Sequence, residues 1–84
     1  MPQARYHYMI DFFFPDTSQV DGVRKEAHRI VASGDSEAIK ESEIATIGAR
    51  PSFGPPVKPK FFRLRKVFRK REEVIYDSSK VPHA

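Results

Sequence analysis

The chain has 84 residues, a formal net charge of +4 and no cysteine. A chain of this length is expected to form one domain with a small hydrophobic core. The lack of cysteine excludes disulfides and thiolate metal sites, so we expect a reducing, cytoplasmic setting. No apolar run approaches the roughly 20 residues that a membrane-spanning helix needs, so we expect no membrane span.

The charge is distributed unevenly along the chain. Residues 1–55 hold six Lys/Arg and eight Asp/Glu, whereas residues 56–84 hold nine and three. Within the second part, residues 58–71 contain eight cations and no acid. We call residues 58–71 the basic segment. Such a local excess favours attraction to polyanions, although charge alone defines no activity.

The first predicted strand covers residues 5–14. Side chains alternate between the two faces of a strand, and one face here is entirely apolar: Tyr6, Tyr8, Ile10, Phe12 and Phe14. The other face is mixed: His7, Met9, Asp11 and Phe13. This pattern predicts a central strand whose apolar side packs on the core.

The segment 23–32 has two readings. A helix beginning near Ser18 would align a stripe of aliphatic residues, Val20, Val23, Ala27, Ile30 and Val31. Gly22 and the β-branched pair Ile30-Val31 favour a strand instead. We interpret residues 27–32 as a strand and keep the helix as the alternative.

A helix is predicted over residues 36–47. Asp35 or Ser36 is expected to cap it, and Glu37 stands in the first turn, where the helix dipole favours an acid. The predicted inner stripe consists mostly of small side chains: Ala38, Ile39, Ser42, Ala45 and Thr46. Small side chains allow the helix to lie close to a sheet that carries larger ones.

The C-terminal third predicts a connector and then a hairpin. Residues 51–59 contain four prolines and should be extended and stiff. Two strand-like runs follow, 61–68 and 72–76, and a three-residue loop at 69–71 joins them. We expect one domain over residues 1–77 and a disordered tail over 78–84.

A three-residue loop fixes an expected register for the hairpin. It places Phe68 opposite Glu72, Lys66 opposite Val74, Leu64 opposite Tyr76, Arg63 opposite Asp77 and Val67 opposite Glu73. Val74 then lies on the core face with Phe62, Leu64, Phe68 and Tyr76.

These elements predict an α+β fold. We expect a small antiparallel sheet of three or four strands, packed on one face by an α-helix, in the order β-β-α-β-β. The alternative order, β-α-α-β-β, depends on the ambiguous segment 23–32.

The basic segment suggests a nucleic-acid-binding surface. Its cations would contact phosphates without reading the base sequence, and an exposed ring among them would stack on bases. The residues proposed for this surface are Lys58, Lys60, Arg63, Arg65, Arg69, Lys70 and Arg71, with Phe61 as the stacking ring. The more ordinary interpretation is a solvated strand face, because charged residues cover most protein surfaces.

A second hypothesis concerns the mixed face of the first strand. One helix covers only one face of a sheet, so Met9 and Phe13 need another cover. A homodimer, with sheets paired face to face or edge to edge, would supply it. Alternatively, the connector 51–59 and the tail shield this face.

The sequence offers no motif for catalysis, a cofactor or a metal. His7, His28 and His83 lack metal-ligand spacing. The four glycines are scattered, and no serine stands in a nucleophile motif. We therefore expect no enzyme and no small-molecule substrate. The leading hypothesis is a small non-catalytic interaction module whose partner is an unknown protein or a second copy, and the alternative is a nucleic-acid-binding accessory protein.

Overall fold

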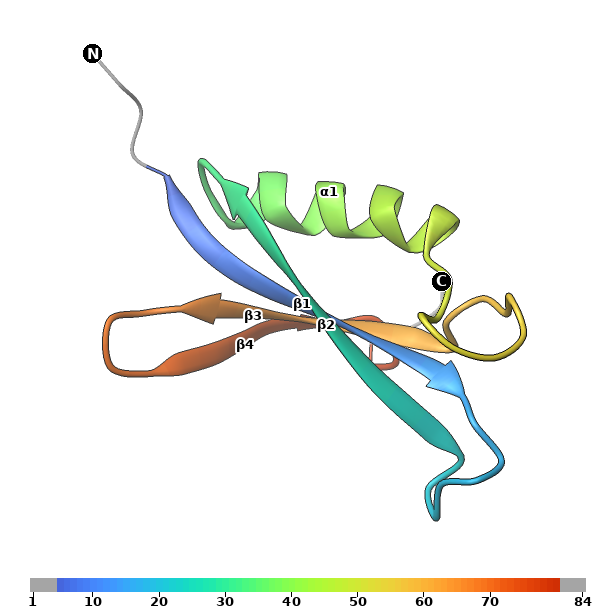
Figure 1. Ribbon diagram of the computed structural model, residues 1–84. Coiled ribbons are helices and arrows are strands. Elements are labelled where there is room, and N and C mark those ends of the chain that lie inside the picture. The colour runs from blue at the N-terminus through green and yellow to red at the C-terminus, as the bar shows by residue number, and fades with distance from the viewer. Residues whose placement is uncertain (1–4, 81–84) are drawn as a thin grey trace.

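The computed structural model describes residues 5–80 and contains a four-stranded antiparallel sheet and one helix (Figure 1). The elements are β1 (Tyr6–Pro15), β2 (Val23–Ala32), α1 (Asp35–Gly48), β3 (Phe61–Val67) and β4 (Glu72–Asp77). The predicted α+β fold and the order β-β-α-β-β are confirmed, and the alternative order with two helices is wrong. The strands lie in the order β2-β1-β3-β4.

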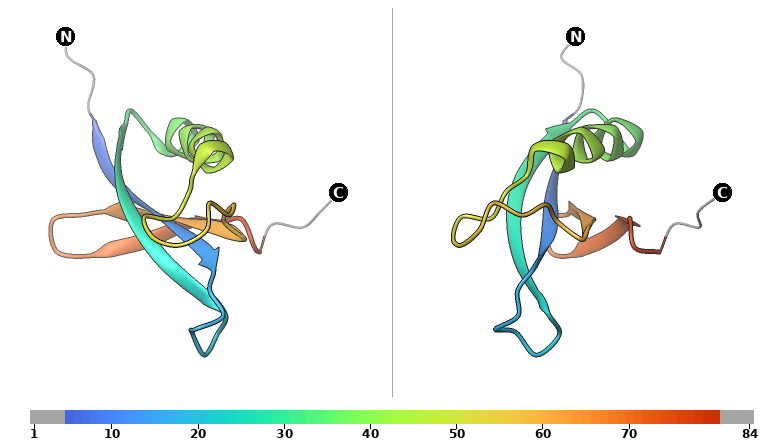
Figure 2. Two further views of the ribbon diagram at one scale, coloured as in Figure 1. Left: turned by 45° about the vertical axis from the view of Figure 1, so that its right-hand side comes forward. Right: turned by 90° about the vertical axis from the view of Figure 1, so that its right-hand side faces the viewer.

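Strand β1 is central to the sheet. It pairs along its whole length with β2 and, from His7 to Phe13, with β3. The sheet is strongly twisted, so the β1–β2 ribbon crosses the β3–β4 ribbon at a steep angle (Figure 1). Helix α1 lies against one side of this sheet (Figure 2), so the molecule has one face of the sheet covered by a helix and one that is not.

The hydrophobic core lies between α1 and the apolar face of β1. It consists of Tyr8, Ile10, Phe12 and Phe14 from β1, Phe62 and Leu64 from β3, Ala32 from β2 and Ala38 from α1. All are buried. Burying one large apolar side chain contributes about 1.5–3 kcal/mol, so the four buried residues of β1 contribute substantially to stability.

Strand β2 is longer than the sequence indicated. It begins at Val23, not at residue 27, because β1 continues to Pro15 and offers pairing partners for the whole segment. The intervening turn is closed by a hydrogen bond from the Asp16 N–H to the Gly22 carbonyl at 2.8 Å. Gly22 has a φ of 78°, a conformation that glycine adopts without strain. The helical alternative for this segment is wrong.

The beginning of α1 differs from the prediction. Gly34 is the N-cap residue, and no side chain caps the helix, so the expected cap at Asp35 or Ser36 is wrong. Asp35 instead accepts a hydrogen bond from the Tyr8 hydroxyl at 2.7 Å. Its carboxylate therefore ties the first turn of the helix to the sheet and is not available to its own backbone.

The inner stripe of α1 is only partly as predicted. Ala38 and Ser42 are buried, and the Ser42 hydroxyl donates to the Ala38 carbonyl at 2.7 Å. Ala45 is exposed, contrary to prediction, because it lines a hollow of about 390 Å³ between the C-terminal half of α1 and strands β1 and β2. The twisting sheet descends away from the helix at this end (Figure 1).

The register of the β3–β4 hairpin agrees with the prediction only at the end far from the turn, where β3 begins and β4 ends. Leu64 pairs with Tyr76, and Arg63 pairs with Asp77, as expected. Between Leu64 and Arg65 the register shifts by one residue, which the pattern of alternating side chains does not reveal.

Beyond this bulge the expected pairs are wrong. Lys66 faces Glu73 and Val67 faces Glu72. Phe68 lies in a four-residue turn, 68–71, where its N–H donates to the Arg71 carbonyl at 2.8 Å. Val74 pairs with Arg65 and is 51% exposed, so it is not a core residue.

The connector that follows α1 lies on the helix side of the sheet. Glu26 of β2 accepts hydrogen bonds from the Ser52 N–H at 2.9 Å and the Ser52 hydroxyl at 2.7 Å. Arg24 donates to the Phe53 carbonyl at 2.8 Å. Both β2 residues pair with core positions of β1, so the idea that the connector shields the other face is wrong.

The division into a domain over 1–77 and a tail over 78–84 stays a prediction. Ser78 donates its N–H to the Phe62 carbonyl at 3.0 Å. Residues 1–4 and 81–84, including His83, lie outside the described part of the chain. Within residues 5–80, α1 is neither long nor apolar enough to cross a membrane as a helix.

Candidate interaction surface

The face of the sheet opposite α1 carries most of the residues singled out from the sequence. We call it the helix-free face. It comprises His7, Met9, Asp11 and Phe13 of β1 and the residues that pair with them: Val31, Arg29, Ala27 and Lys25 on β2, and Val67, Arg65, Arg63 and Phe61 on β3. These positions share a face because paired residues in antiparallel strands project to the same side.

A fully buried carboxylate stands at the centre of the helix-free face. Asp11 has no exposed surface. Arg65 donates hydrogen bonds to both carboxylate oxygens of Asp11. Its Nε donates to Oδ2 at 2.8 Å, and its NH2 donates to Oδ1 at 2.7 Å. The Arg63 Nε donates to Oδ2 at 3.2 Å. Such two-pronged, charge-assisted contacts are among the stronger hydrogen bonds in proteins, and they fix both guanidinium groups against the sheet.

Arg65 has a second acidic partner, Glu72 at the start of β4, which it binds through NH1. The hydrogen bonds with Asp11, followed by those with Glu72, raise the pKa of Arg65 above its usual value. Sequence reasoning missed this network, since Asp11 is 52 and 54 residues from its partners. The one signal was a single acid within the otherwise apolar run of residues 9–14.

Two aromatic rings extend the fixed surface beside Asp11. Phe13 and Phe61 stack with ring centroids 4.4 Å apart and planes 11° from parallel. The guanidinium carbon of Arg63 lies 5.3 Å from the Phe13 ring centroid, within cation–π range. Phe61, proposed from the sequence as a ring for base stacking, therefore already has one of its faces against Phe13.

The structure divides the proposed nucleic-acid-binding cations into three groups. Arg63 and Arg65 are paired with acids in the middle of the strand, and Arg71 lies 3.7 Å from Glu73. Lys58 and Lys60 are exposed before β3, and Arg69 and Lys70 are exposed after it. Between residues 5 and 80, these last four side chains make no ion pair. Strand β3, whose seven residues span about 23 Å, separates Lys58 and Lys60 from Arg69 and Lys70.

Lys66, a cation of the basic segment, belongs to the opposite side of the sheet. Its Nζ lies 3.1 Å from the Asp35 carboxylate and 4.4 Å from the Tyr6 ring centroid. The hydrogen bond from Tyr8, and then that from Lys66, lower the pKa of Asp35. Burial, and then the bond to Asp35, raise the pKa of Tyr8. This cluster holds α1 to the sheet and leaves Lys66 unavailable to a partner.

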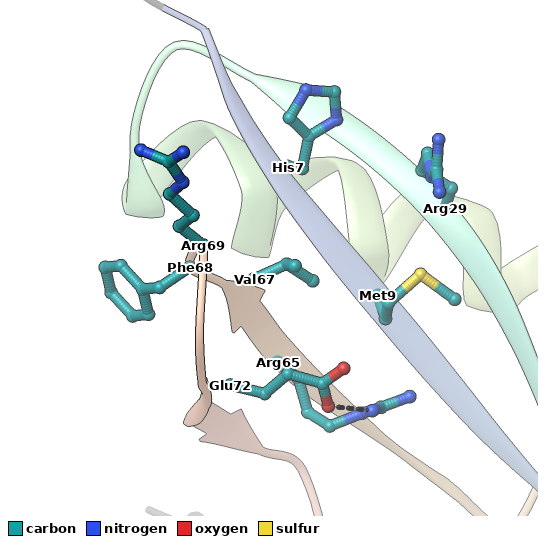
Figure 3. Close-up of a pocket in the computed structure, with 8 residues that line it drawn as sticks. All are labelled: His7, Met9, Arg29, Arg65, Val67, Phe68, Arg69 and Glu72. Carbon is teal, nitrogen blue, oxygen red and sulfur yellow. Dashed lines mark hydrogen bonds and ion pairs between the residues drawn. The ribbon is translucent and has the colours of Figure 1, made fainter.

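Met9 and Phe13, proposed as dimer contacts, are both partly buried on the helix-free face. Met9 lies between Arg29 and Arg65 in the two strand pairings. It forms part of the floor of a concavity of about 560 Å³. Figure 3 shows the residues around this concavity, which come from all four strands and from the β3–β4 turn.

The lining of this concavity is divided by chemistry. Met9, Val67 and Phe68 contribute apolar surface, while His7, Arg29, Arg65, Arg69 and Glu72 contribute polar surface. The lining thus contains three arginines and one glutamate, and the glutamate already forms an ion pair with Arg65. An apolar floor with a cationic rim suits a ligand that combines aliphatic and acidic groups.

The described residues were also compared with the requirements of a metal site. Between residues 5 and 80, no three His, Asp or Glu side chains converge closely enough to hold a metal ion. Comparison with protein-family models, curated proteins and solved structures finds no match to this chain.

Proposed function

We propose that this protein is a small non-catalytic interaction module that binds a protein partner through its helix-free face. The observation that carries the proposal is the buried Asp11, which holds Arg63 and Arg65 flat against the sheet beside Phe13. Arginine, aromatic residues and methionine are enriched in protein interfaces, and arginine is frequent among the residues that dominate binding energy.

Preorganisation is the physical advantage of this arrangement. An arginine that is free in solution loses rotamer freedom when a partner binds it, which opposes association. Arg63 and Arg65 have lost that freedom already through their bonds to Asp11. The partner that this surface fits is an acidic protein surface with aliphatic side chains, because the neighbouring concavity has an apolar floor and a cationic rim. A cytoplasmic setting remains part of the proposal.

Nucleic-acid binding is the second candidate function. Four exposed cations that make no ion pair within residues 5–80 support it: Lys58, Lys60, Arg69 and Lys70. A single strand that follows β3 would meet two cations at each end and the partly neutralised Arg63 and Arg65 between them. Binding of this kind is mostly electrostatic and weakens steeply with salt.

The two functions are separated by amide NMR titrations of the full chain at low and moderate salt. One titration uses an acidic peptide of alternating Glu and Leu, and the other a mixed-sequence single-stranded RNA. The proposal predicts that the peptide shifts resonances around Met9 and Arg29 and that Met9→Lys abolishes these shifts. Peptide binding that leaves these resonances unchanged, or no binding, would overturn it.

A matched variant tests the second candidate. Lys58→Glu combined with Lys60→Glu reverses two exposed charges before β3 and leaves both the Asp11 network and the lining of the concavity unchanged. The nucleic-acid function predicts salt-sensitive RNA shifts at both ends of β3 that this variant removes. Variants of Arg63 and Arg65 are unsuitable here, since they would also leave the buried Asp11 without its partners.

A further inference from the structure

We propose that the partner of the helix-free face is a second copy of this chain, which presents the outer surface of its own helix α1. The inference rests on the proposed function above and names the partner. Each chain would use two different surfaces, the helix-free face and the outside of α1, so that copies associate head to tail. This differs from the face-to-face or edge-to-edge pairing expected from the sequence.

The outer surface of α1 combines exposed aliphatic and acidic side chains. Ile44 is 60% exposed and Ile47 is 73% exposed. Glu37 and Glu41 precede Ile44 at helical spacing, and Lys40 lies on the same outer side, four residues before Ile44. Glu37 also accepts hydrogen bonds from Ser33. Asp35 of this helix is bound to Tyr8 and Lys66, so its other acids, Glu37, Glu41 and Glu43, stand against the single cation Lys40. Large aliphatic side chains exposed on a helix indicate an interaction site when they are adjacent.

The concavity of the helix-free face complements the outer surface of α1 in apolar surface and in charge. Met9 and Val67 offer apolar surface to Ile44 and Ile47, and Arg29 and Arg69 stand at the rim as partners for the glutamates. Opposite potentials on facing surfaces favour association and fix the register. Face-to-face pairing of two helix-free faces would instead bring two cationic rims together, which costs free energy.

The dimensions of the two surfaces also agree. The 14 residues of α1 span about 21 Å. The four strands span about 19 Å across the sheet, and β1 and β2 are about 33 Å long. A neighbour's helix on the second face would give the sheet a helical layer on both sides, a common arrangement of layers. Head-to-tail association of this kind closes into a ring or continues as a chain.

The test uses the full chain and two variants with opposite defects. Ile44→Lys damages the helix surface but keeps the helix-free face, whereas Arg29→Glu damages the face but keeps the helix. Sedimentation equilibrium from micromolar to millimolar concentration measures the mass of each. Val20→Lys, in the exposed β1–β2 turn, is the control for adding a lysine in place of an aliphatic residue.

The proposal predicts a concentration-dependent mass for the wild type and for the control. Each variant alone should self-associate about tenfold or more weakly, since each lacks one side of the interface. An equimolar mixture of the two variants should regain one intact interface and form a dimer that contains one of each. A dimer that pairs two helix-free faces, or two sheet edges, does not produce this rescue.

Three results would overturn the inference. The first is a helix variant that associates like the wild type, which indicates pairing through the sheet alone. The second is a mixture of variants that stays monomeric. The third is a wild type that is monomeric at every concentration, and in that case binding of the acidic peptide decides whether the proposed function survives without self-association. If amide spectra show that Arg29→Glu unfolds the chain, Met9→Lys replaces it as the face variant.

Discussion

The two faces of the sheet are stabilised by different physical interactions, although they alternate along the same strands. On the covered face, the even-numbered residues of β1 from Tyr8 to Phe14 are buried in the hydrophobic core. On the helix-free face, the odd-numbered residues surround Asp11, whose carboxylate is buried by two arginines and not by a helix.

The comparison shows how a sheet can keep one face ordered without a second layer. Apolar burial is non-directional and depends on the area removed from water. Ion pairs and stacked rings are directional, so they fix Arg63, Arg65 and Phe61 in place while leaving part of each accessible. The covered face contributes most of the stability, and the helix-free face contributes a rigid surface. The following predictions test this division.

The largest effect is expected on the covered face. Phe14→Ala should lower the free energy of unfolding by about 3–5 kcal/mol, because the ring is almost fully buried and its loss leaves a cavity. Urea denaturation followed by circular dichroism measures the change. Val74→Ala, on the exposed surface of the helix-free side, should change it by under about 0.5 kcal/mol. Equal effects from the two would show that the faces do not differ in this way.

The next largest effect concerns the centre of the helix-free face. Asp11→Ala should destabilise the chain by about 2–3 kcal/mol, somewhat less than for a wholly buried pair because Arg63 and Arg65 keep some access to water. Adding Arg65→Met to Asp11→Ala should restore part of the loss, since one unpaired cation is then removed. A double variant that is as unstable as the sum of its single changes would contradict a direct interaction.

A smaller effect is expected from the stacked rings. Phe61→Leu keeps an apolar side chain but removes the stack on Phe13, and should cost about 0.5–1.5 kcal/mol. Phe53→Leu provides the matched control, because Phe53 is 75% exposed in the connector. Thermal unfolding of both variants would distinguish them, and a larger shift for Phe53→Leu would disprove the role given to the stack.

The smallest effect appears only in acid, on the covered side. Hydrogen bonds from Ser52 lower the pKa of Glu26 below its ordinary value of 4.5. The unfolded chain therefore takes up this proton first, so the contribution of Glu26 to stability is present above pH 4.5 and is lost as the pH falls through the lowered pKa. Urea midpoints between pH 6 and pH 3 should depend less on pH in Glu26→Gln than in the wild type. Ser52→Ala, which removes a hydroxyl that donates to Glu26, should reduce the dependence in the same direction.

The covered face was predictable from the sequence because its signal is local. Alternation along residues 5–14 identifies Tyr8, Ile10 and Phe12 without knowledge of any partner strand. The small residues Ala38 and Ser42 identify the side of the helix that meets them. Hydrophobic period and residue size are enough to derive this half of the molecule.

The helix-free face was not predictable in the same way, because its signals are not local. The role of Asp11 depends on pairing with residues more than fifty positions away, and the local signal, one acid among apolar residues, does not identify those partners. The bulge after Leu64 also lacks a sequence signature, so the expected partners of Lys66 and Val67 were wrong. Cations that formed one continuous row in the sequence are therefore separated by pairing in the fold.

The central position of β1 has a consequence for synthesis on the ribosome. Strand β2 follows β1 within a few residues and can pair with it as soon as both leave the exit tunnel, but β3 begins only at Phe61. Until then the other edge of β1 exposes unpaired backbone groups, and unpaired strand edges promote aggregation. The nascent chain passes through its most vulnerable state after α1 has emerged and before the connector delivers β3.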